Sequence, residues 1–513
     1  MMTKKEQFIE ELNSRYKTKG AFITLGKGIL DGEVLPEVDI NIPLKTVNRH
    51  GLIAGATGTG KTKTLQVFIE QLSHAGVPSL VMDIKGDLSG VAAAGEENAK
   101  IQERYAKTKL PYSPQAFPVE LMSVSEEKGV KLRATVTEFG PVLLSKILGL
   151  NETQSSIISI IFKYCDDKGL PLIDLEDLKK VLQFVTDNPQ GKKELAEAYG
   201  SISPASLGAI LRSIVALEQQ GASHIFGEPS FDVQDLLETR DGKGVINILR
   251  VTDIQNKPAV FSTFMLSLFA EIYLTFPEAG DLDKPKLAVF IDEAHLIFKD
   301  APKVLLDQIE TMVKLIRSKG VGIYFITQIP GDVPENVLSQ LGLKIQHALR
   351  GFTAKDKKEI NKAVQNYPTT AYYKTEELIQ ALGIGEALIT ALDEKGIPTP
   401  LAHTYLISPE SRMDVLSAAE IDHLVSTSRM VAKYNQSIDK ESAYEILMRR
   451  MNGEEVSSVE QPAEPVSKPA EPSVFETILS SSMAQTFGKT LMREGAKAII
   501  GMLGLKTTTK KKK

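Results

Sequence analysis

Residues 55–62 read Gly-Ala-Thr-Gly-Thr-Gly-Lys-Thr, the complete pattern of a phosphate-binding loop. The three glycines let the backbone curl until successive N–H groups point at a phosphate. Lys61 would bring positive charge to the β- and γ-phosphates, and the Thr62 hydroxyl would bind Mg²⁺. The pattern therefore predicts a site for ATP and Mg²⁺. The residues expected to contact the nucleotide are Gly55, Ala56, Thr57, Gly58, Thr59, Gly60, Lys61, Thr62 and Lys63.

The segments on either side of this loop match the elements that it needs. An apolar run over 50–54 favours a buried strand, and apolar residues at helical spacing over 64–74 favour a helix. That helix would place the positive end of its dipole beneath the phosphates. The alternative is a glycine-rich turn that binds nothing, and the strand–loop–helix context argues against it.

A second motif supplies the acids that nucleotide hydrolysis needs. The apolar run over 286–292 ends in Asp292, and Glu293 follows it. Asp292 at a strand tip would hold Mg²⁺, and Glu293 would orient and polarise the attacking water. The alternative is a strand that ends in a solvated acidic turn. The phosphate loop upstream, with a βαβ layout between the two motifs, favours the functional interpretation.

Three further residues are candidates for contacts with the γ-phosphate. Gln328 ends the apolar run 321–327 and would sense the γ-phosphate, or it would only cap the strand. Arg317 and Arg350 follow core elements, from which they would reach the nucleotide of a neighbouring subunit. The alternative for each arginine is a solvated or paired surface side chain.

The sequence gives weaker evidence for a role of other polar residues near these motifs. Asp83, Lys85 and Asp87 follow the apolar run 79–83, at the edge where such sheets bind ligands. They would touch Mg²⁺ or its water network, or would form a turn. His295 is not expected to bind zinc, because no cluster of His, Cys and Glu at ligand spacing surrounds it.

Composition excludes several classes of protein. The chain has 513 residues, a net charge of −5 and one cysteine, Cys165, so no internal disulfide can form. No apolar run is long enough to span a membrane, and the N-terminus lacks an apolar signal core, so a cytoplasmic protein is expected. The whole chain is not a basic nucleic-acid binder. A ring that is acidic outside and basic in its pore would still bind DNA.

The order of patterns predicts an α/β protein with a mostly parallel sheet. Changes of pattern and composition divide it into a short N-terminal helix with strands (1–49), a first part of the nucleotide core (50–94), a helical insertion (95–240), a second part of the core (241–410), a helical extension (411–453), a flexible Glu/Pro/Ser-rich linker (454–473) and an amphipathic C-terminal helix with a basic tail (474–513). The C-terminal helix is expected to pack on the core or on a neighbouring subunit. The alternative is docking on anionic lipid or DNA.

Four segments together resemble the bacterial HerA-like ATPases of the HerA/FtsK group, most closely the YjgR-type branch. They are residues 49–62, 83–87, 290–295 and 317–322, the last with Thr327-Gln328 downstream. The resemblance covers about residues 20–410. It implies a RecA-like core, ATP hydrolysis and hexameric rings that move DNA through a central pore. It also implies that Gln328 senses the γ-phosphate.

The chain departs from the family in one respect and leaves three functions to weigh. About fifty residues precede the loop, too few for the β-barrel of HerA proper, so DNA-end resection with a partner nuclease is not expected.

The three functions to weigh are a ring-forming motor on double-stranded DNA, a motor or switch that acts on protein partners, and a nucleotide-binding scaffold without activity. The intact pair of Asp292 and Glu293 argues against the scaffold.

Overall fold

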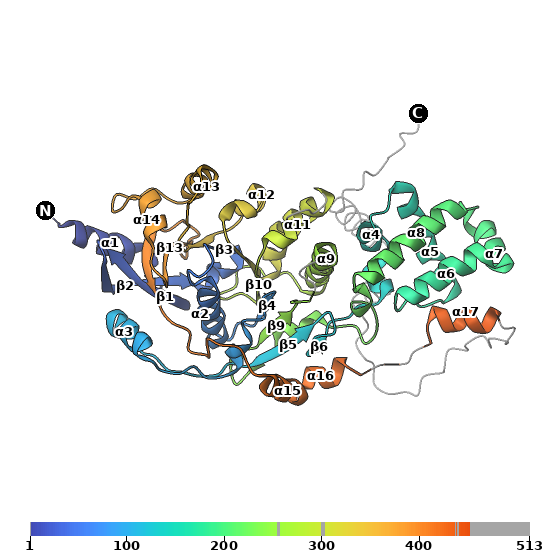
Figure 1. Cartoon of the computed structure of the whole chain (residues 1–513), viewed down its shortest axis with the longest axis horizontal. Helices are drawn as coiled ribbons and strands as arrows, with labels where there is room; N and C mark the ends of the chain where they lie inside the picture. The colour runs from blue at the N-terminus through green and yellow to red at the C-terminus, as the bar shows by residue number, and fades with distance from the viewer. Residues whose placement is uncertain (1, 254–256, 299–302, 437, 439–440, 452–513) are drawn as a thin grey trace.

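The computed structural model describes residues 2–451 except 254–256, 299–302, 437 and 439–440. The linker and the C-terminal helix expected over 454–473 and 474–513 lie outside the described residues. The molecule is elongated, with a large sheet at one end and a group of helices at the other (Figure 1).

The elements have the following bounds. The strands are β1 (Phe22–Leu30), β2 (Glu33–Pro43), β3 (Gly51–Ala54), β4 (Ser79–Asp83), β5 (Val119–Ser123), β6 (Val130–Lys131), β7 (Thr239–Arg240), β8 (Lys243–Gly244), β9 (Ile246–Arg250), β10 (Leu287–Ile291), β11 (Val321–Thr327), β12 (Leu343–Gln346), β13 (Glu386–Thr390) and β14 (Ala402–Leu406). The helices are α1 (Lys4–Tyr16), α2 (Lys61–His74), α3 (Ala99–Thr108), α4 (Val136–Ile147), α5 (Glu152–Lys168), α6 (Leu175–Asp187), α7 (Pro189–Tyr199), α8 (Pro204–Gln219), α9 (Pro258–Thr275), α10 (His295–Phe298), α11 (Lys303–Ile316), α12 (Glu335–Leu338), α13 (Ala354–Val364), α14 (Thr375–Ala381), α15 (Ala418–Thr427), α16 (Arg429–Tyr434) and α17 (Ala443–Met451).

A single 12-stranded sheet organises the chain, in the order β2-β1-β14-β13-β12-β3-β11-β10-β4-β9-β5-β6. The strands from β12 to β6 run parallel to one another. The four strands at the other end, β13, β14, β1 and β2, pair antiparallel. The carboxyl ends of the parallel strands therefore meet at one edge, where open sheets of this kind bind ligands.

Both faces of the sheet are buried, because successive side chains of a strand point to opposite sides. In β3, Leu52 belongs to one hydrophobic cluster and Ile53 to the other. The helices α9 and α11 contribute to the cluster of Leu52, and α1 and α2 contribute to the cluster of Ile53. The continuous apolar runs of the central strands follow from this two-sided burial, and the predicted α/β fold is confirmed.

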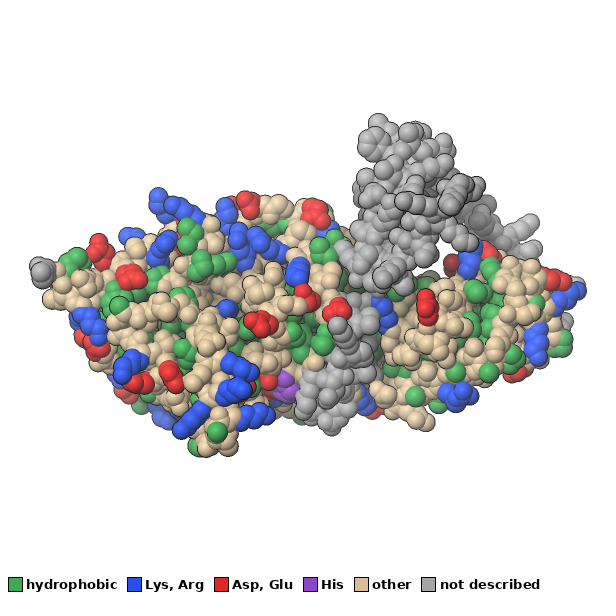
Figure 2. All heavy atoms as spheres, turned by 90° about the horizontal axis from the view of Figure 1, so that it is seen from above, with side chains coloured by type: hydrophobic (Ala, Val, Ile, Leu, Met, Phe, Trp, Pro, Cys, Tyr) green, Lys and Arg blue, Asp and Glu red, His purple; other side chains and the backbone are tan. Residues whose placement is uncertain are grey.

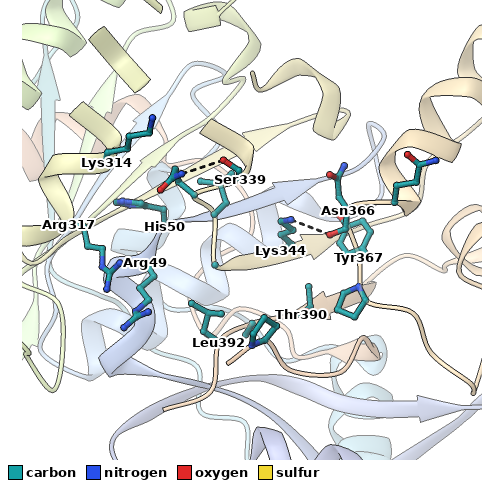
Figure 3. Close-up of a pocket in the computed structure, with 17 residues that line it drawn as sticks. Arg49, His50, Lys314, Arg317, Ser339, Lys344, Asn366, Tyr367, Thr390 and Leu392 are labelled. Atoms are coloured by element: carbon teal, nitrogen blue, oxygen red, sulfur yellow. Dashed lines mark hydrogen bonds between the residues drawn. The ribbon is translucent and has the colours of Figure 1, made fainter. Parts of the chain in front are cut away.

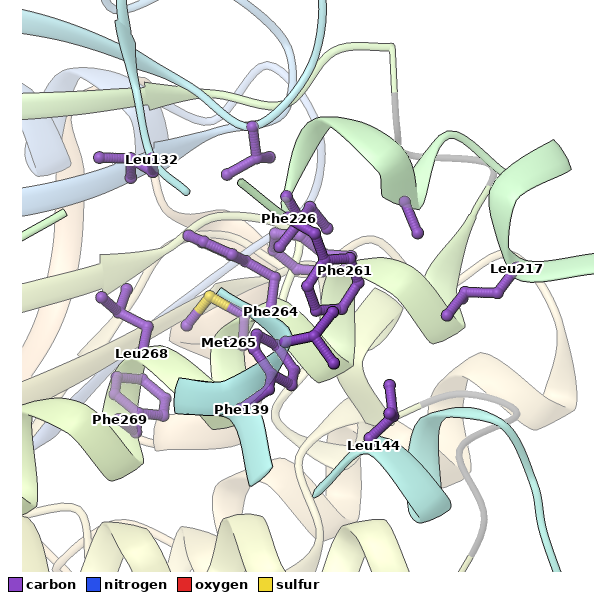
Figure 4. Packing of buried hydrophobic residues seen from close by; sticks show 14 of the residues in the cluster. Leu132, Phe139, Leu144, Leu217, Phe226, Phe261, Phe264, Met265, Leu268 and Phe269 are labelled. Atoms are coloured by element: carbon purple, nitrogen blue, oxygen red, sulfur yellow. The ribbon is translucent and has the colours of Figure 1, made fainter. Parts of the chain in front are cut away.

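The segment expected as a helical insertion also contains strands. Helices α4 to α8 form the helical group at the end of the molecule away from α1 (Figure 1). However, β5 and β6 lie inside 95–240 and extend the main sheet beside β9, so that segment is not only helical. The helical group packs on α9 through aromatic side chains that include Phe139 of α4 and Phe264 of α9, both shown in Figure 4.

The first fifty residues belong to the same sheet. β1 and β2 form a long antiparallel pair, and β1 pairs with β14. Helix α1 packs on this pair, and the hydroxyl of its Tyr16 donates to the carbonyl of Ile389 in β13 at 2.9 Å. Among the described helices, none is by itself long and apolar enough to cross a membrane. The pair α7 and α8, bent by 108°, meets that test only when the two are taken together.

Candidate functional site

The phosphate loop joins β3 to α2 at the carboxyl edge of the sheet, as predicted. Gly58 and Gly60 have φ angles of 77° and 110°, which favour glycine. At Gly55 the reason is space, because a side-chain carbon there would lie 2.5 Å from Cβ of His347. Lys61 is the first residue of α2, so the N–H groups at the start of that helix remain available to a phosphate.

Lys61 lies across its own loop. Its ammonium donates to the carbonyls of Gly55 at 2.6 Å and Ala56 at 3.2 Å. Burial lowers the pKa of Lys61 and the nearby cation of Lys85 lowers it further, while Glu293 and Asp292 act in the opposite direction. Two cations and two carboxylates therefore belong to one electrostatic cluster beside the loop.

The two acids follow β10, the second neighbour of β3 in the sheet. The side chains of Asp292 and Glu293 are only 5 % and 10 % exposed. The Asp292 carboxylate accepts from the backbone N–H of Glu293 at 2.9 Å. Glu293 has a φ angle of 47°, a left-handed conformation that costs a non-glycine residue on the order of 1–3 kcal/mol. Burial raises the pKa of Asp292 to about 6, as expected for a carboxyl group that a cation would stabilise.

The carboxylate of Glu293 has one oxygen engaged and one available. Oε1 contacts the ammonium of Lys85, which also lies 4.0 Å from Oδ2 of Asp292. Oε2 is 3.2 Å from Nδ1 of His295, but without the alignment of a hydrogen bond, and it has no hydrogen-bond partner among the described residues. A buried carboxylate oxygen without a partner suits a residue that orients a water molecule.

Asp83 and Lys85, for which two roles were open, have different surroundings. Asp83 accepts backbone N–H bonds from Gly86 at 2.7 Å, Asp87 at 3.2 Å and Leu88 at 3.1 Å. It therefore holds the turn after β4. Burial raises the pKa of Asp83 to about 6, against the effect of these bonds. Lys85 instead contacts the acids of the site.

Gln328 lies beside the loop. Thr327, the last residue of β11, pairs with Ala54, and its carbonyl accepts from the N–H of Gly55 at 3.2 Å. Gln328 comes next and is exposed. Sequence order alone placed it at a strand tip, and the pairing of β11 with β3 puts that tip against the phosphate loop.

Lys63, counted among the nucleotide contacts, extends its side chain away from the loop. Its ammonium donates to Gln66 at 3.2 Å and to the carbonyl of Met413. The same segment binds α2 again further along the helix, where Glu70 accepts from the backbone N–H groups of Glu410 and Ser411. The chain after β14 therefore covers the helix that carries the loop.

His347 is a residue of the site that the sequence did not indicate. It follows β12, which pairs with β3, and its N–H donates to the carbonyl of Ala54 at 2.7 Å. Its Nε2 is 2.9 Å from the hydroxyl of Thr64 in α2. Burial and, to a smaller degree, the charge of Lys61 lower the pKa of His347 to about 4, so the ring is neutral. Only the folded structure brings His347 to the loop, because β12 follows β3 by almost 300 residues.

The two candidate arginines lie at opposite edges of the sheet. Arg350 is near the loop, since the neighbouring Ala348 accepts from the N–H of Ala56 at 2.8 Å. It is exposed and donates to the carbonyl of Gln380 at 2.6 Å. Arg317 precedes β11 and lies at the amino edge, on the wall of a cavity (Figure 3). The length of β11 separates it from the loop of its own chain, roughly 20 Å at the rise of a strand.

Comparisons with known proteins agree with this arrangement. The family model described as "Helicase HerA-like C-terminal" matches residues 30–511. The DNA double-strand break repair helicase HerA of Sulfurisphaera tokodaii is 23% identical over 366 residues, which cover 69% of this chain and 64% of that protein. The protein of the same name from Saccharolobus solfataricus is 24% identical over 387 residues, which cover 74% and 68%. The match therefore spans slightly less than two thirds of the Sulfurisphaera relative.

Solved structures share the fold. The unbound bacterial conjugative coupling protein TrwBdeltaN70 superposes with a TM-score of 0.52 at 15% identity, covering 80% of this chain and 95% of that one. The plasmid coupling protein TrwB in complex with ADP and Mg²⁺ gives a TM-score of 0.50 at 15% identity, covering 78% and 100%. The sheet and its surrounding helices therefore have the fold of these coupling proteins, in agreement with the predicted α/β core.

Proposed function

Because this chain belongs to the HerA-like helicase family, whose C-terminal model matches residues 30–511, we propose that it hydrolyses ATP with Mg²⁺ and works as a ring-forming motor on double-stranded DNA. One observation carries the hydrolase: the phosphate loop and the two acids meet at one edge of the sheet. β11 joins them, because it pairs with β3 on one side and with β10 on the other.

Each residue of this edge has a role in the proposed reaction. The N–H groups of the loop and the ammonium of Lys61 bind the triphosphate. Thr62 and Asp292 would hold Mg²⁺, which would neutralise negative charge on the phosphates. Glu293 orients and polarises the attacking water through its free oxygen, and Gln328 contacts the γ-phosphate.

The proposed assembly is a homo-oligomer, and the resemblance to the HerA/FtsK group favours a hexamer. Its support is the position of Arg317 at the edge opposite to its own phosphate loop, where its side chain is exposed and makes no hydrogen bond or ion pair with another described residue. In a head-to-tail ring this edge would face the loop of the next copy, and an arginine supplied in that way stabilises the transition state. Arg350, near its own loop, is the other candidate for this role.

Double-stranded DNA is the favoured substrate because two relatives in the family are named as DNA repair helicases. The exterior gives no separate support: on the face in Figure 2, Lys and Arg side chains are interspersed with Asp and Glu. A motor or switch that acts on protein partners is the alternative. Stimulation of ATP hydrolysis by duplex DNA distinguishes the two.

The proposal extends to the organisation of the chain. Residues 50–94 and 241–410 form one ATPase core, 95–240 is inserted into it, and 1–49 and 411–453 flank it. β5 and β6 belong to the sheet, so the part that projects from the core is the helical group α4 to α8. A cytoplasmic location is proposed from the single cysteine.

The decisive experiment measures ATP binding and hydrolysis separately. The wild-type protein should hydrolyse ATP only with Mg²⁺ present. Lys61→Ala should lose ATP binding at the phosphate loop, because the Lys61 charge contacts the phosphates there. Glu293→Gln should bind ATP normally and hydrolyse it at least about a hundredfold more slowly, because only the activation of water is lost. Hydrolysis by Glu293→Gln at the wild-type rate would show that another residue activates the water.

A further inference from the structure

A cavity of about 510 Å³, here called the amino-edge cavity, lies at the edge of the sheet opposite to the phosphate loop. Its wall is built by one chain from residues before β3, before β11 and before β12, together with the end of β13 and the segment 365–368 (Figure 3). Its volume falls within the range of small-molecule sites, roughly 300–1,000 Å³. Nothing in the proposed hydrolysis reaction of the same chain uses this edge.

The wall of the amino-edge cavity is strongly cationic. Arg49, Lys314, Arg317 and Lys344 line it, and none of the described lining residues is Asp or Glu. Among described residues, Arg49 and Arg317 make no side-chain hydrogen bond or ion pair. Lys344 donates only to the carbonyl of Asn366, at 3.2 Å. Lys314 is the exception, since Glu310 one turn earlier in α11 lies 2.6 Å from its ammonium.

These cations are held near one another without a matching anion inside the cavity. Burial lowers the pKa of Arg317 and the neighbouring Arg49 lowers it further, which indicates mutual repulsion; Asp281 acts in the opposite direction. Asp281 lines, with Glu278 and Glu394, a separate, adjoining cavity of about 480 Å³ that shares Arg49, Lys314 and Arg317. Among the described residues no carboxylate forms an ion pair with Arg49, Arg317 or Lys344, and a phosphate group is the ligand that fits fixed guanidinium and ammonium groups.

His50 lies in the same wall as a neutral ring. Its Nδ1 accepts from the backbone N–H of Ile323 at 3.0 Å, so the proton of the neutral ring must be on Nε2. Burial lowers the pKa of His50 to about 4, against a smaller opposite effect of the Val313 carbonyl, and the ring therefore stays neutral. The side chain is 3 % exposed, and Nε2 is buried beside that carbonyl without the geometry of a hydrogen bond, so His50 adds no charge to the cavity.

We propose that the amino-edge cavity binds a free phosphate-bearing ligand of nucleotide size, at a site separate from the phosphate loop. Arg49 and Lys344 supply the charge-assisted donors; Arg317, on the same wall, is the residue proposed above to reach the nucleotide of the next copy. The phosphates of a nucleotide held by a second copy of the chain offer the same chemistry, so the experiment must separate a free ligand from a neighbour's nucleotide.

The test uses Lys61→Ala, in which no copy is expected to hold a nucleotide at its loop. Pyrophosphate and ATP are titrated into this variant by calorimetry. We expect binding near one ligand per chain, and Arg49→Gln or Lys344→Gln added to Lys61→Ala should weaken it by about tenfold or more, the usual cost of losing a charge-assisted bond. The matched control is Lys45→Gln, four residues before Arg49 and exposed, which does not line the amino-edge cavity and should change nothing.

Three results would overturn the proposal. One is the absence of any binding by Lys61→Ala that folds with the wild-type melting temperature. A second is a pair of results: ATP hydrolysis is restored when Arg49→Gln is mixed with Glu293→Gln, and Lys61→Ala binds no ligand. Together they would show that the amino-edge cavity contacts a nucleotide held by a neighbouring copy. The third is loss of duplex DNA binding in Arg49→Gln with pyrophosphate binding unchanged. The titrations require no hydrolysis, so failure of the proposed ATPase would not affect them.

Discussion

Lys85→Met tests whether the cation next to the two acids positions Glu293. The change keeps the length of the side chain and removes a charge that contacts Glu293 and lies 4.0 Å from Asp292. At that distance the attraction is ~4 kcal/mol at an effective dielectric constant of 20. The Lys85 side chain is 41% exposed, so solvent screening reduces this to on the order of 1–1.5 kcal/mol. If the closer contact of Lys85 with Glu293 contributes a similar amount to positioning Glu293 in the transition state, kcat falls by roughly five- to tenfold.

Steady-state hydrolysis and equilibrium ATP binding must be measured on the same preparation. We expect kcat to fall and the affinity for ATP to stay within about twofold, since Lys61 and the loop N–H groups still bind the phosphates. Lys85→Arg, which retains the charge, should recover most of the rate. A Lys85→Met protein with an unchanged or faster kcat would refute the reasoning, because Lys85 would then be neutral or would restrain Glu293 rather than position it.

Three further outcomes are expected. Arg317→Ala and Glu293→Gln should each be nearly inactive alone but partly active when mixed, since mixed interfaces combine an intact arginine with an intact acid. The rate of ATP hydrolysis by the mixtures measures this recovery. A mixture without recovery would exclude action of Arg317 across subunits. Phe290→Ala should lower the free energy of unfolding by about 3–5 kcal/mol in urea titrations, because Phe290 is fully buried and stacks on Tyr324. Burial raises the pKa of Glu70 to about 7, above its unfolded value, so its contribution to stability is greatest at low pH and is lost as pH rises to about 7. Melting temperatures should therefore show Glu70→Gln gaining relative to wild type between pH 5 and pH 8, and a constant difference would contradict the assigned pKa.

The central strands were predictable because burial on both faces leaves a clear sequence signal. β4 and β11 coincide with the apolar runs 79–83 and 321–327. β5 was missed because its second residue, Glu120, interrupts the apolar run. Glu120 is buried, and Arg240 and Ser428 neutralise and bind its carboxylate. Partners that lie more than a hundred residues away leave no local pattern.

The sequence likewise indicated some residues of the candidate site and not others. The loop and the acids were recognisable because each is a short contiguous motif with a fixed chemical use. The contact of Lys85 with Glu293 was not, because it depends on β4 and β10 lying side by side in the sheet. His347 was invisible for a similar reason, as its role follows from the pairing of β12 with β3. The sequence also did not predict on which edge of the sheet Arg317 lies, because this depends on the direction in which β11 runs.

The position of β3 between β11 and β12 has a consequence for how the protein folds during synthesis. β3 carries the phosphate loop, yet both of its partners in the sheet follow it by roughly 270–290 residues. At elongation rates of about 5–20 residues per second, the ribosome needs on the order of 15–60 s to deliver them. Until then the loop has neither the Thr327 carbonyl nor His347 beside it. The nascent chain must therefore complete most of its length before it can bind a nucleotide, and for that interval β3 lacks both of its partners in the sheet.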